Sequence, residues 1–81
     1  MKKNNEGYFT RQEWNNLKRK HNYSCLCCGK KEPEIKIVPD HKIPLSRYGD
    51  NNIQNIQPLC ARCNNVKWAK IISLSELRKL V

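Results

Sequence analysis

The sequence predicts a small α+β domain that a hydrophobic core alone would not hold together. Its 81 residues suffice for one domain, but only 38% of them are apolar, and a chain of this size buries a small interior. An alternating polar and apolar stretch, typical of a strand, lies between two segments that begin with helix-capping patterns. Two closely spaced pairs of cysteines accompany them, and no repeat or low-complexity linker divides the chain. We therefore expect one compact unit with an additional stabilising element.

The amino-terminal part predicts an arm followed by a helix. Residues 1–9 are rich in Lys and Asn and lack an apolar pattern, so we expect a flexible basic arm. Thr10 and Glu13 match a capping box, which predicts a leading helix within residues 10–24, over about 11–21. Three bulky apolar side chains at helical positions are expected in the core: Trp14, Leu17 and, from a later helix, Trp68.

The rest of the chain predicts one strand, a weaker second strand and two helices. Polar and apolar residues alternate over 34–38, which suits a half-buried strand. Residues 39–58 have a loop-like composition, with a weak second strand over 53–57. A helix is expected over 61–71, and a capping-box pattern begins a final helix within 73–81.

The charge balance is strongly basic. Lys and Arg total 16 against 7 acidic residues, giving a net charge of +9. The basic residues are spread along the chain, which favours a polyanionic partner, most simply nucleic acid; a solvated basic surface is the alternative. No segment approaches the roughly 20 apolar residues of a membrane span, and the first residues lack the apolar core of a signal peptide. We expect a cytoplasmic protein of bacterial or phage type, in which thiols stay reduced.

The five cysteines indicate a metal site rather than disulfides. Four of them form two pairs, each with two intervening residues: Cys25 with Cys28, and Cys60 with Cys63. At this spacing one turn of backbone presents two thiolates to one ion, so the four predict a closed, structural Zn2+ site. Isolated buried thiols or a redox pair explain the two equal spacings less well. Cys27 is expected to point away from the metal. Residues 29–59, between the pairs, exceed the roughly 15–20 residues usual in compact zinc modules.

The segment between the cysteine pairs contains PDHKIP, residues 39–44, in which an acid stands beside one of only two histidines. Neighbouring side chains of a regular strand point to opposite faces. If Asp40 and His41 serve one site, a bend is therefore expected there, stiffened by the proline on either side.

Residues 40–67, DHKIPLSRYGDNNIQNIQPLCARCNNVK, resemble the HNH nuclease motif. The resemblance extends from about Trp14 to Lys67 and includes CxxCG, DHxxPLSRxG, NIQPLC and CxxCNxxK in order. It implies a zinc-stabilised ββα-metal (His-Me finger) domain with flanking helices: two antiparallel strands and then a helix, clasping a catalytic divalent ion. Its zinc-bound core would cover residues 25–70 of a single domain, 1–81. The chain would be the variant with Asn, where His is frequent, at the third motif position.

The resemblance implies a role for each motif residue. His41 falls on the first position and is expected to be the general base that activates water, because histidine is the side chain most often used as a base near neutral pH. Asp40 and Asn64 are expected to hold a divalent ion as a Lewis acid, and Asn55 to fix the loop that carries His41. Two oxygen ligands suit Mg2+ or Mn2+ better than Zn2+. Three basic residues are candidate phosphate contacts: Arg47, Arg62 and Lys67.

These observations predict a metal-dependent endonuclease that hydrolyses DNA, expected to be double-stranded. Little in the chain beyond the nuclease module can read a long site, so we expect low intrinsic sequence specificity. Two alternatives stay open: a zinc-dependent nucleic-acid-binding module without catalysis, and an HNH nuclease that acts on RNA. A zinc module that recruits a protein fits the charge least well. Cleavage of both strands would need a homodimer or two visits by one small site.

Overall fold

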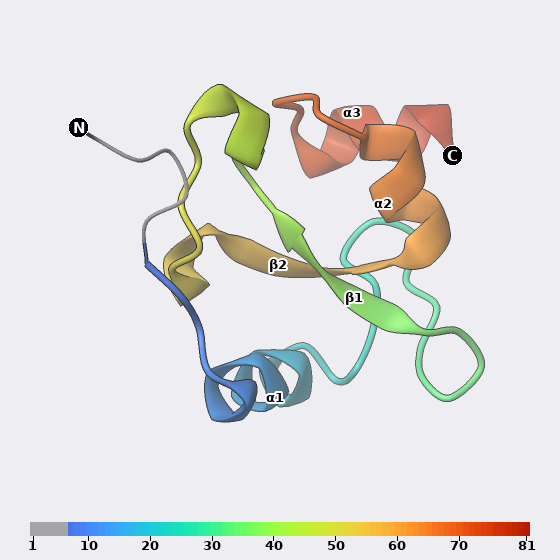
Figure 1. Ribbon diagram of the computed structural model, residues 1–81. Coiled ribbons are helices and arrows are strands. Elements are labelled where there is room, and N and C mark those ends of the chain that lie inside the picture. The colour runs from blue at the N-terminus through green and yellow to red at the C-terminus, as the bar shows by residue number, and fades with distance from the viewer. Residues whose placement is uncertain (1–6) are drawn as a thin grey trace.

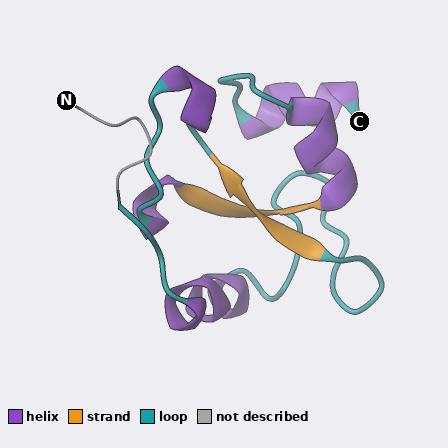
Figure 2. Cartoon of the chain, in the orientation of Figure 1, coloured by secondary structure: helices purple, strands orange, loops and turns teal. Residues whose placement is uncertain are grey.

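Two short antiparallel strands lie at the centre of the fold, with helices on both sides (Figure 1). The structure is a computed structural model that describes residues 7–81; residues 1–6 of the predicted basic arm lie outside the described part. The elements follow in the order α1 (Arg11–Lys20), β1 (Ile37–His41), η1 (Leu45–Arg47), η2 (Ile53–Asn55), β2 (Ile56–Cys60), α2 (Ala61–Lys67) and α3 (Leu74–Leu80). Loops join most of them, and Figure 2 shows how short the sheet is beside those loops.

The strands and the second helix form a ββα unit. β1 and β2 pair along their full length, from Ile37 opposite Cys60 to His41 opposite Ile56. α2 begins directly after β2 without a connecting loop. In Figure 1, α1 lies on one side of the sheet, and α2 and α3 lie on the other. This arrangement agrees with the predicted α+β domain with flanking helices.

The interior is small and rich in sulfur. Its largest cluster of buried residues combines four cysteines with three aliphatic side chains, of which Leu59 and Leu77 are fully buried. Trp14 packs against this cluster from α1, in agreement with the expected core position, whereas Leu17 is only half-buried. Among residues 7–81, no helix combines the length and apolar content of a membrane span.

The predicted caps of the first and last helices are present. Thr10 accepts a hydrogen bond from the Glu13 backbone N–H at 3.0 Å, and the Glu13 carboxylate accepts one from the Thr10 N–H at 2.9 Å. These two bonds satisfy backbone groups that the start of a helix would otherwise leave without partners. Ser73 accepts from the Glu76 backbone N–H at 3.2 Å at the start of α3. Both helices therefore begin where the local sequence predicts.

The predicted strand boundaries were wrong by about three residues. β1 starts at Ile37 rather than at residue 34 and continues through the segment that was expected to be loop. Residues 31–35 form a turn instead, in which the Ile35 N–H donates to the Lys31 carbonyl at 3.1 Å. In a two-stranded sheet each strand keeps one free edge, so proline is tolerated in both, and Pro39 lies opposite Pro58. β2 is displaced likewise, because η2 occupies the start of the predicted second strand.

The helix expected over 61–71 ends at Lys67. The chain turns at Trp68, whose backbone adopts a positive φ of 51° with ψ of −128°. This turn directs the side chain away from the interior, and Trp68 is 79% exposed. The expectation that Trp68 belongs to the core was therefore wrong.

Leu77 connects α3 to the sulfur-rich interior and offers a test of the packing. Because its side chain is fully buried, we expect Leu77→Ala to lower the free energy of unfolding by about 2–5 kcal/mol. Leu80→Ala is the matched control on the same helix, since Leu80 is 53% exposed, and should change it by less than about 0.5 kcal/mol. Urea unfolding of the zinc-loaded proteins measures both. Equal effects of the two substitutions would show that α3 does not dock as described.

Candidate active site

Four cysteine sulfurs converge at the junction of β2 and α2. The ligand atoms of Cys25, Cys28, Cys60 and Cys63 all lie within 4.8 Å of one another. The Sγ atoms of Cys28 and Cys60 are 3.8 Å apart. Four Zn–S bonds of ~2.3 Å in a tetrahedron place their sulfurs about 3.8 Å apart, so this donor set fits the predicted Zn2+.

Two separate pieces of backbone bring these sulfurs together. Cys25 begins a tight turn that the Gly29 N–H closes on the Cys25 carbonyl at 2.9 Å. Gly29 has φ of 82°, a conformation that glycine adopts without steric strain. Cys60 ends β2 and caps α2, where its sulfur accepts from the Cys63 N–H at 3.5 Å. The Leu26 N–H donates to the Pro58 carbonyl at 3.1 Å and so holds the turn against β2.

The surroundings of the thiols make Cys25 easier to deprotonate than Cys63. Burial acts to raise the pKa of Cys25, but hydrogen bonds from neighbouring backbone amides outweigh it and lower this pKa to about 7. Burial, together with hydrogen bonds to neighbouring sulfurs, raises the pKa of Cys63. A metal ion must therefore displace protons from the site as it binds, and the Cys25 proton is the easier of these two to remove.

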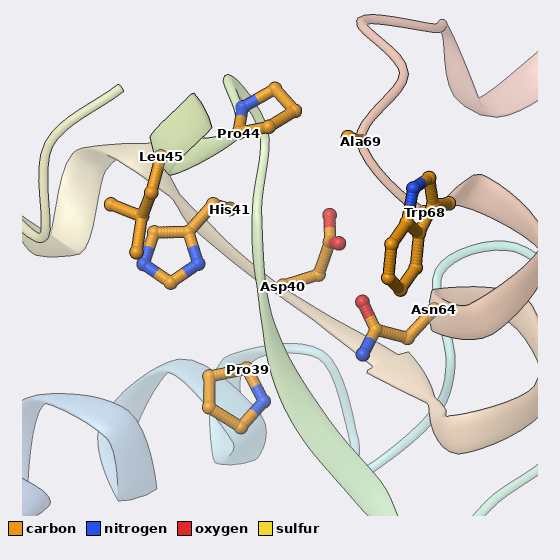
Figure 3. A pocket seen from close by; sticks show the side chains of 8 residues that line it. All are labelled: Pro39, Asp40, His41, Pro44, Leu45, Asn64, Trp68 and Ala69. Carbon is orange, nitrogen blue, oxygen red and sulfur yellow. The ribbon is translucent and has the colours of Figure 1, made fainter. Parts of the chain in front are cut away.

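A second group of chemically active side chains lines a hollow of about 420 Å³ between the end of β1 and α2. Figure 3 shows its lining, which consists of Pro39, Asp40, His41, Pro44, Leu45, Asn64, Trp68 and Ala69. Asp40 and His41 come from the end of β1, and Asn64 comes from α2. The fold thus brings together the three residues that were predicted to bind the catalytic ion and activate water.

The expected bend between Asp40 and His41 is not present. Both residues belong to β1, where Asp40 pairs with Gln57 and His41 with Ile56. Their side chains project to opposite sides of the strand in Figure 3, as regular strand geometry dictates. Both residues nevertheless line the hollow, together with Pro44 from the segment that follows β1.

Asp40 is held by a buried network. It is 3% exposed, and the Gln57 amide donates to its Oδ2 at 2.9 Å. The Lys67 ammonium lies 3.3 Å from the same oxygen and donates to the His41 carbonyl at 2.8 Å. Within the described residues both polar contacts of Asp40 use Oδ2, so Oδ1 is the oxygen that can be directed to an ion.

The burial of Lys67 corrects one prediction. Its side chain is 1% exposed, so its ammonium supports Asp40 from the interior and does not lie at the surface, where a phosphate contact was expected. Removal of one partner from a buried ion pair leaves the other charge uncompensated. Arg47, in η1, and Arg62, in the first turn of α2, are exposed, as a phosphate contact requires.

The ring of His41 has a partner that the sequence analysis missed. Its Nε2 lies 2.8 Å from Oδ1 of Asn51. A carboxamide oxygen only accepts hydrogen bonds, so Nε2 is the donor and the neutral ring carries its lone pair on Nδ1. Asn51 stands in a run of polar loop residues without periodicity, and no local signal distinguishes it from its neighbours.

Asn55 makes the contacts expected of a residue that fixes the loop after His41. Its Oδ1 accepts from the Ile43 N–H at 2.9 Å, and its Nδ2 donates to the Ile43 and Asp50 carbonyls at 3.0 and 2.8 Å. Its own carbonyl accepts from the Lys42 N–H at 2.7 Å. Asn55 therefore closes the loop over residues 42–50 with its side chain and its carbonyl together.

The ββα unit, the four-sulfur site and the adjoining hollow define a nuclease-type domain with a metal site. Residues 25–70 match the family model described as HNH endonuclease. This match covers more than half of the chain, which therefore belongs to the HNH endonuclease family. A comparison with curated proteins finds no match.

Zinc content tests the four-sulfur site. We expect one zinc ion per chain in the purified protein, because four thiolates form a closed tetrahedral site. Cys28→Ser and Cys60→Ser should lose the ion and the thermal unfolding transition, since such a site contributes about 10–16 kcal/mol of apparent binding energy. Cys27→Ala is the matched control: this buried neighbour does not belong to the four, so the variant should keep its zinc. Elemental analysis and circular dichroism give both readings, and full zinc retention in Cys60→Ser would refute the assignment.

Proposed function

We propose that this protein is a metal-dependent endonuclease that hydrolyses phosphodiester bonds of double-stranded DNA with low intrinsic sequence specificity. The observation that carries the proposal is the meeting of Asp40, His41 and Asn64 in one hollow, in a chain of the HNH endonuclease family. A module that only binds nucleic acid has no need for a carboxylate, an imidazole and a carboxamide in the lining of one hollow.

His41 acts as the general base. Its Nδ1 lone pair accepts a proton from the attacking water, whose oxygen then adds to the phosphorus as the bond to the leaving oxygen breaks. Asn51 holds Nε2 at 2.8 Å and thereby fixes both the direction of the ring and the tautomer. The Asn55 side chain supports the same arrangement, because its hydrogen bonds to the Ile43 backbone hold the loop that follows His41.

Asp40 and Asn64 supply the oxygens that fit a hard divalent cation. A carboxylate and a carboxamide, completed by water and phosphate oxygens, suit Mg2+ or Mn2+. When bound, the ion supplies a Lewis acid that stabilises charge on the phosphate and on the leaving oxygen. Lys67 and Gln57 hold Asp40 Oδ2, so the carboxylate is oriented before an ion arrives.

Charge provides the attraction for the substrate. The net charge of +9 favours a polyanion, and phosphate contacts by exposed residues such as Arg47 and Arg62 carry no sequence information. Binding should therefore weaken steeply with salt and differ little between sequences.

Plasmid cleavage tests the proposed activity. We expect the wild-type protein to nick or linearise supercoiled DNA with Mg2+ or Mn2+ and to show little activity with Zn2+ alone. His41→Ala should reduce the rate by about 10²–10⁴-fold, the usual contribution of a positioned general base. Agarose gels of time courses give the rates and the ratio of nicked to linear product. His21→Ala is the matched control, because the other histidine caps α1 and does not line the hollow.

Two results would contradict the proposal. If zinc-loaded wild-type protein binds the plasmid and cuts neither DNA nor RNA with any of these ions, the chain is a binding module. If RNA alone is cut, the reaction stands and the substrate assignment is wrong.

The contact of Asn51 with His41 makes a separate prediction. Asn51→Ala removes the acceptor for Nε2, so the ring is free to rotate and to exchange tautomers; we expect kcat to fall about tenfold with KM unchanged. Asn51→Asp keeps an acceptor oxygen and should recover most of the rate. Steady-state cleavage of a fluorescent duplex measures both constants, and an equal loss in both variants would show that Asn51 does not act through the ring.

A further inference from the structure

We propose that Trp68 is a substrate-contact residue, whose indole ring stacks on a nucleobase that has left the stack of its neighbours. The identity of the substrate as nucleic acid rests on the proposed function. The contact itself is inferred from the backbone, the exposure and the position of this one residue.

The backbone at Trp68 has a conformation that suits glycine. Residues 67–70 form a β-turn closed by a hydrogen bond from the Lys70 N–H to the Lys67 carbonyl at 3.0 Å. Trp68 is the first central residue, with φ of 51° and ψ of −128°. These angles match a type II′ turn, in which glycine dominates this position because a Cβ atom is crowded there. A tryptophan at this position therefore works against the local backbone preference.

The side chain gains little from the fold in return. Trp68 is 79% exposed, so its large apolar surface remains in water, and the turn that it occupies would form more readily with glycine. Strained positions of this kind gather at ligand-binding sites, where the strain is retained for the sake of a contact. The contact that Trp68 makes must then be with something outside the chain.

The position of the ring shows where that contact lies. Trp68 and Asn64 form one wall of the hollow, and Pro44 and Leu45 form part of the other (Figure 3). The Trp68 backbone N–H donates to the Asn64 backbone carbonyl at 2.9 Å, so the Trp68 backbone is fixed one helical turn after a proposed ion ligand. A phosphate bound between the walls would bring the bases of its own strand past the exposed ring.

The net charge of the chain and the flat face of the indole favour a nucleobase as the occupant. The net charge of +9 attracts a polyanion and disfavours basic protein partners. Every nucleobase has a flat π-face, so stacking on an indole tolerates any sequence, in agreement with the low specificity proposed above. In an intact duplex both faces of a base are covered, so the base comes either from a single-stranded segment or from a step that opens in the complex.

Fluorescence anisotropy with labelled oligonucleotides tests the contact without cleavage. All variants are made in the His41→Ala background, loaded with zinc and measured without added divalent ions. We expect Trp68→Gly to weaken binding to a single strand about tenfold, through the loss of one base–aromatic stack, and Trp68→Phe to stay within about threefold of the parent. The same variants are also measured with a blunt duplex. An equal loss of affinity for the duplex shows that the protein unstacks a base pair step when it binds. A loss confined to single strands shows that Trp68 stacks only on bases that are already unpaired.

Thermal stability separates this role from a role in folding. Glycine relieves the strained turn, so Trp68→Gly should unfold at the same temperature as the parent or higher. Tyr23→Gly is the matched control: Tyr23 is a second exposed aromatic residue with positive φ, at 57°, and it does not line the hollow. Its substitution should leave binding to every oligonucleotide unchanged.

The outcomes decide the proposal independently of catalysis. Unchanged binding of Trp68→Gly to both kinds of oligonucleotide would overturn it, as would equal losses in Tyr23→Gly or a lowered unfolding temperature that accounts for the loss. The absence of any nucleic-acid binding by the parent would also overturn it. If binding depends on Trp68 while the wild-type protein cleaves no DNA or RNA, the stacking contact stands and the nuclease assignment fails.

Discussion

The convergence of four cysteine sulfurs is the constraint on which the rest of this structure depends. It fastens the turn after α1 to the end of β2 and the start of α2, three segments that a sparse apolar interior could not hold together alone. α3 completes the enclosure, because Arg78 donates to the carbonyls of Leu26 and Cys27 at 2.9 and 3.0 Å. Once β2 and α2 are fixed in this way, β1 can pair along β2, and Asp40 is brought to face Asn64.

The sequence predicted features that depend on a few neighbouring residues. The caps at Thr10 and Ser73 and the cysteine spacings are local, and all were found where expected. Strand limits were missed because pairing between distant segments decides them: Pro39 and Pro58 signal a loop locally but lie opposite each other in the sheet. The early end of α2 was missed for a related reason, since nothing in the local pattern announces a turn at a tryptophan.

Much of the candidate site could likewise be read from the motif, but its supports could not. The residues directed into the hollow belong to short, recognisable stretches. Asn51 lies ten positions from its partner His41 in the sequence. Lys67 lies 26 positions from His41 and 27 from Asp40. A basic residue near the end of a surface helix suggests solvent exposure, and only the three-dimensional packing shows that Lys67 is enclosed with Asp40.

The enclosed Lys67 ammonium affects when the proposed catalytic ion would be needed. Because this ammonium already balances the carboxylate of Asp40, the domain can be assembled and stored without a divalent ion in the hollow. A metal ion held by the four cysteines would instead be part of the architecture. If Asp40 and Asn64 hold a divalent ion as proposed, Mg2+ or Mn2+ would be needed only when the substrate is bound. A protein of this kind would stay folded through fluctuations in cellular magnesium and would respond to them through its rate of turnover alone.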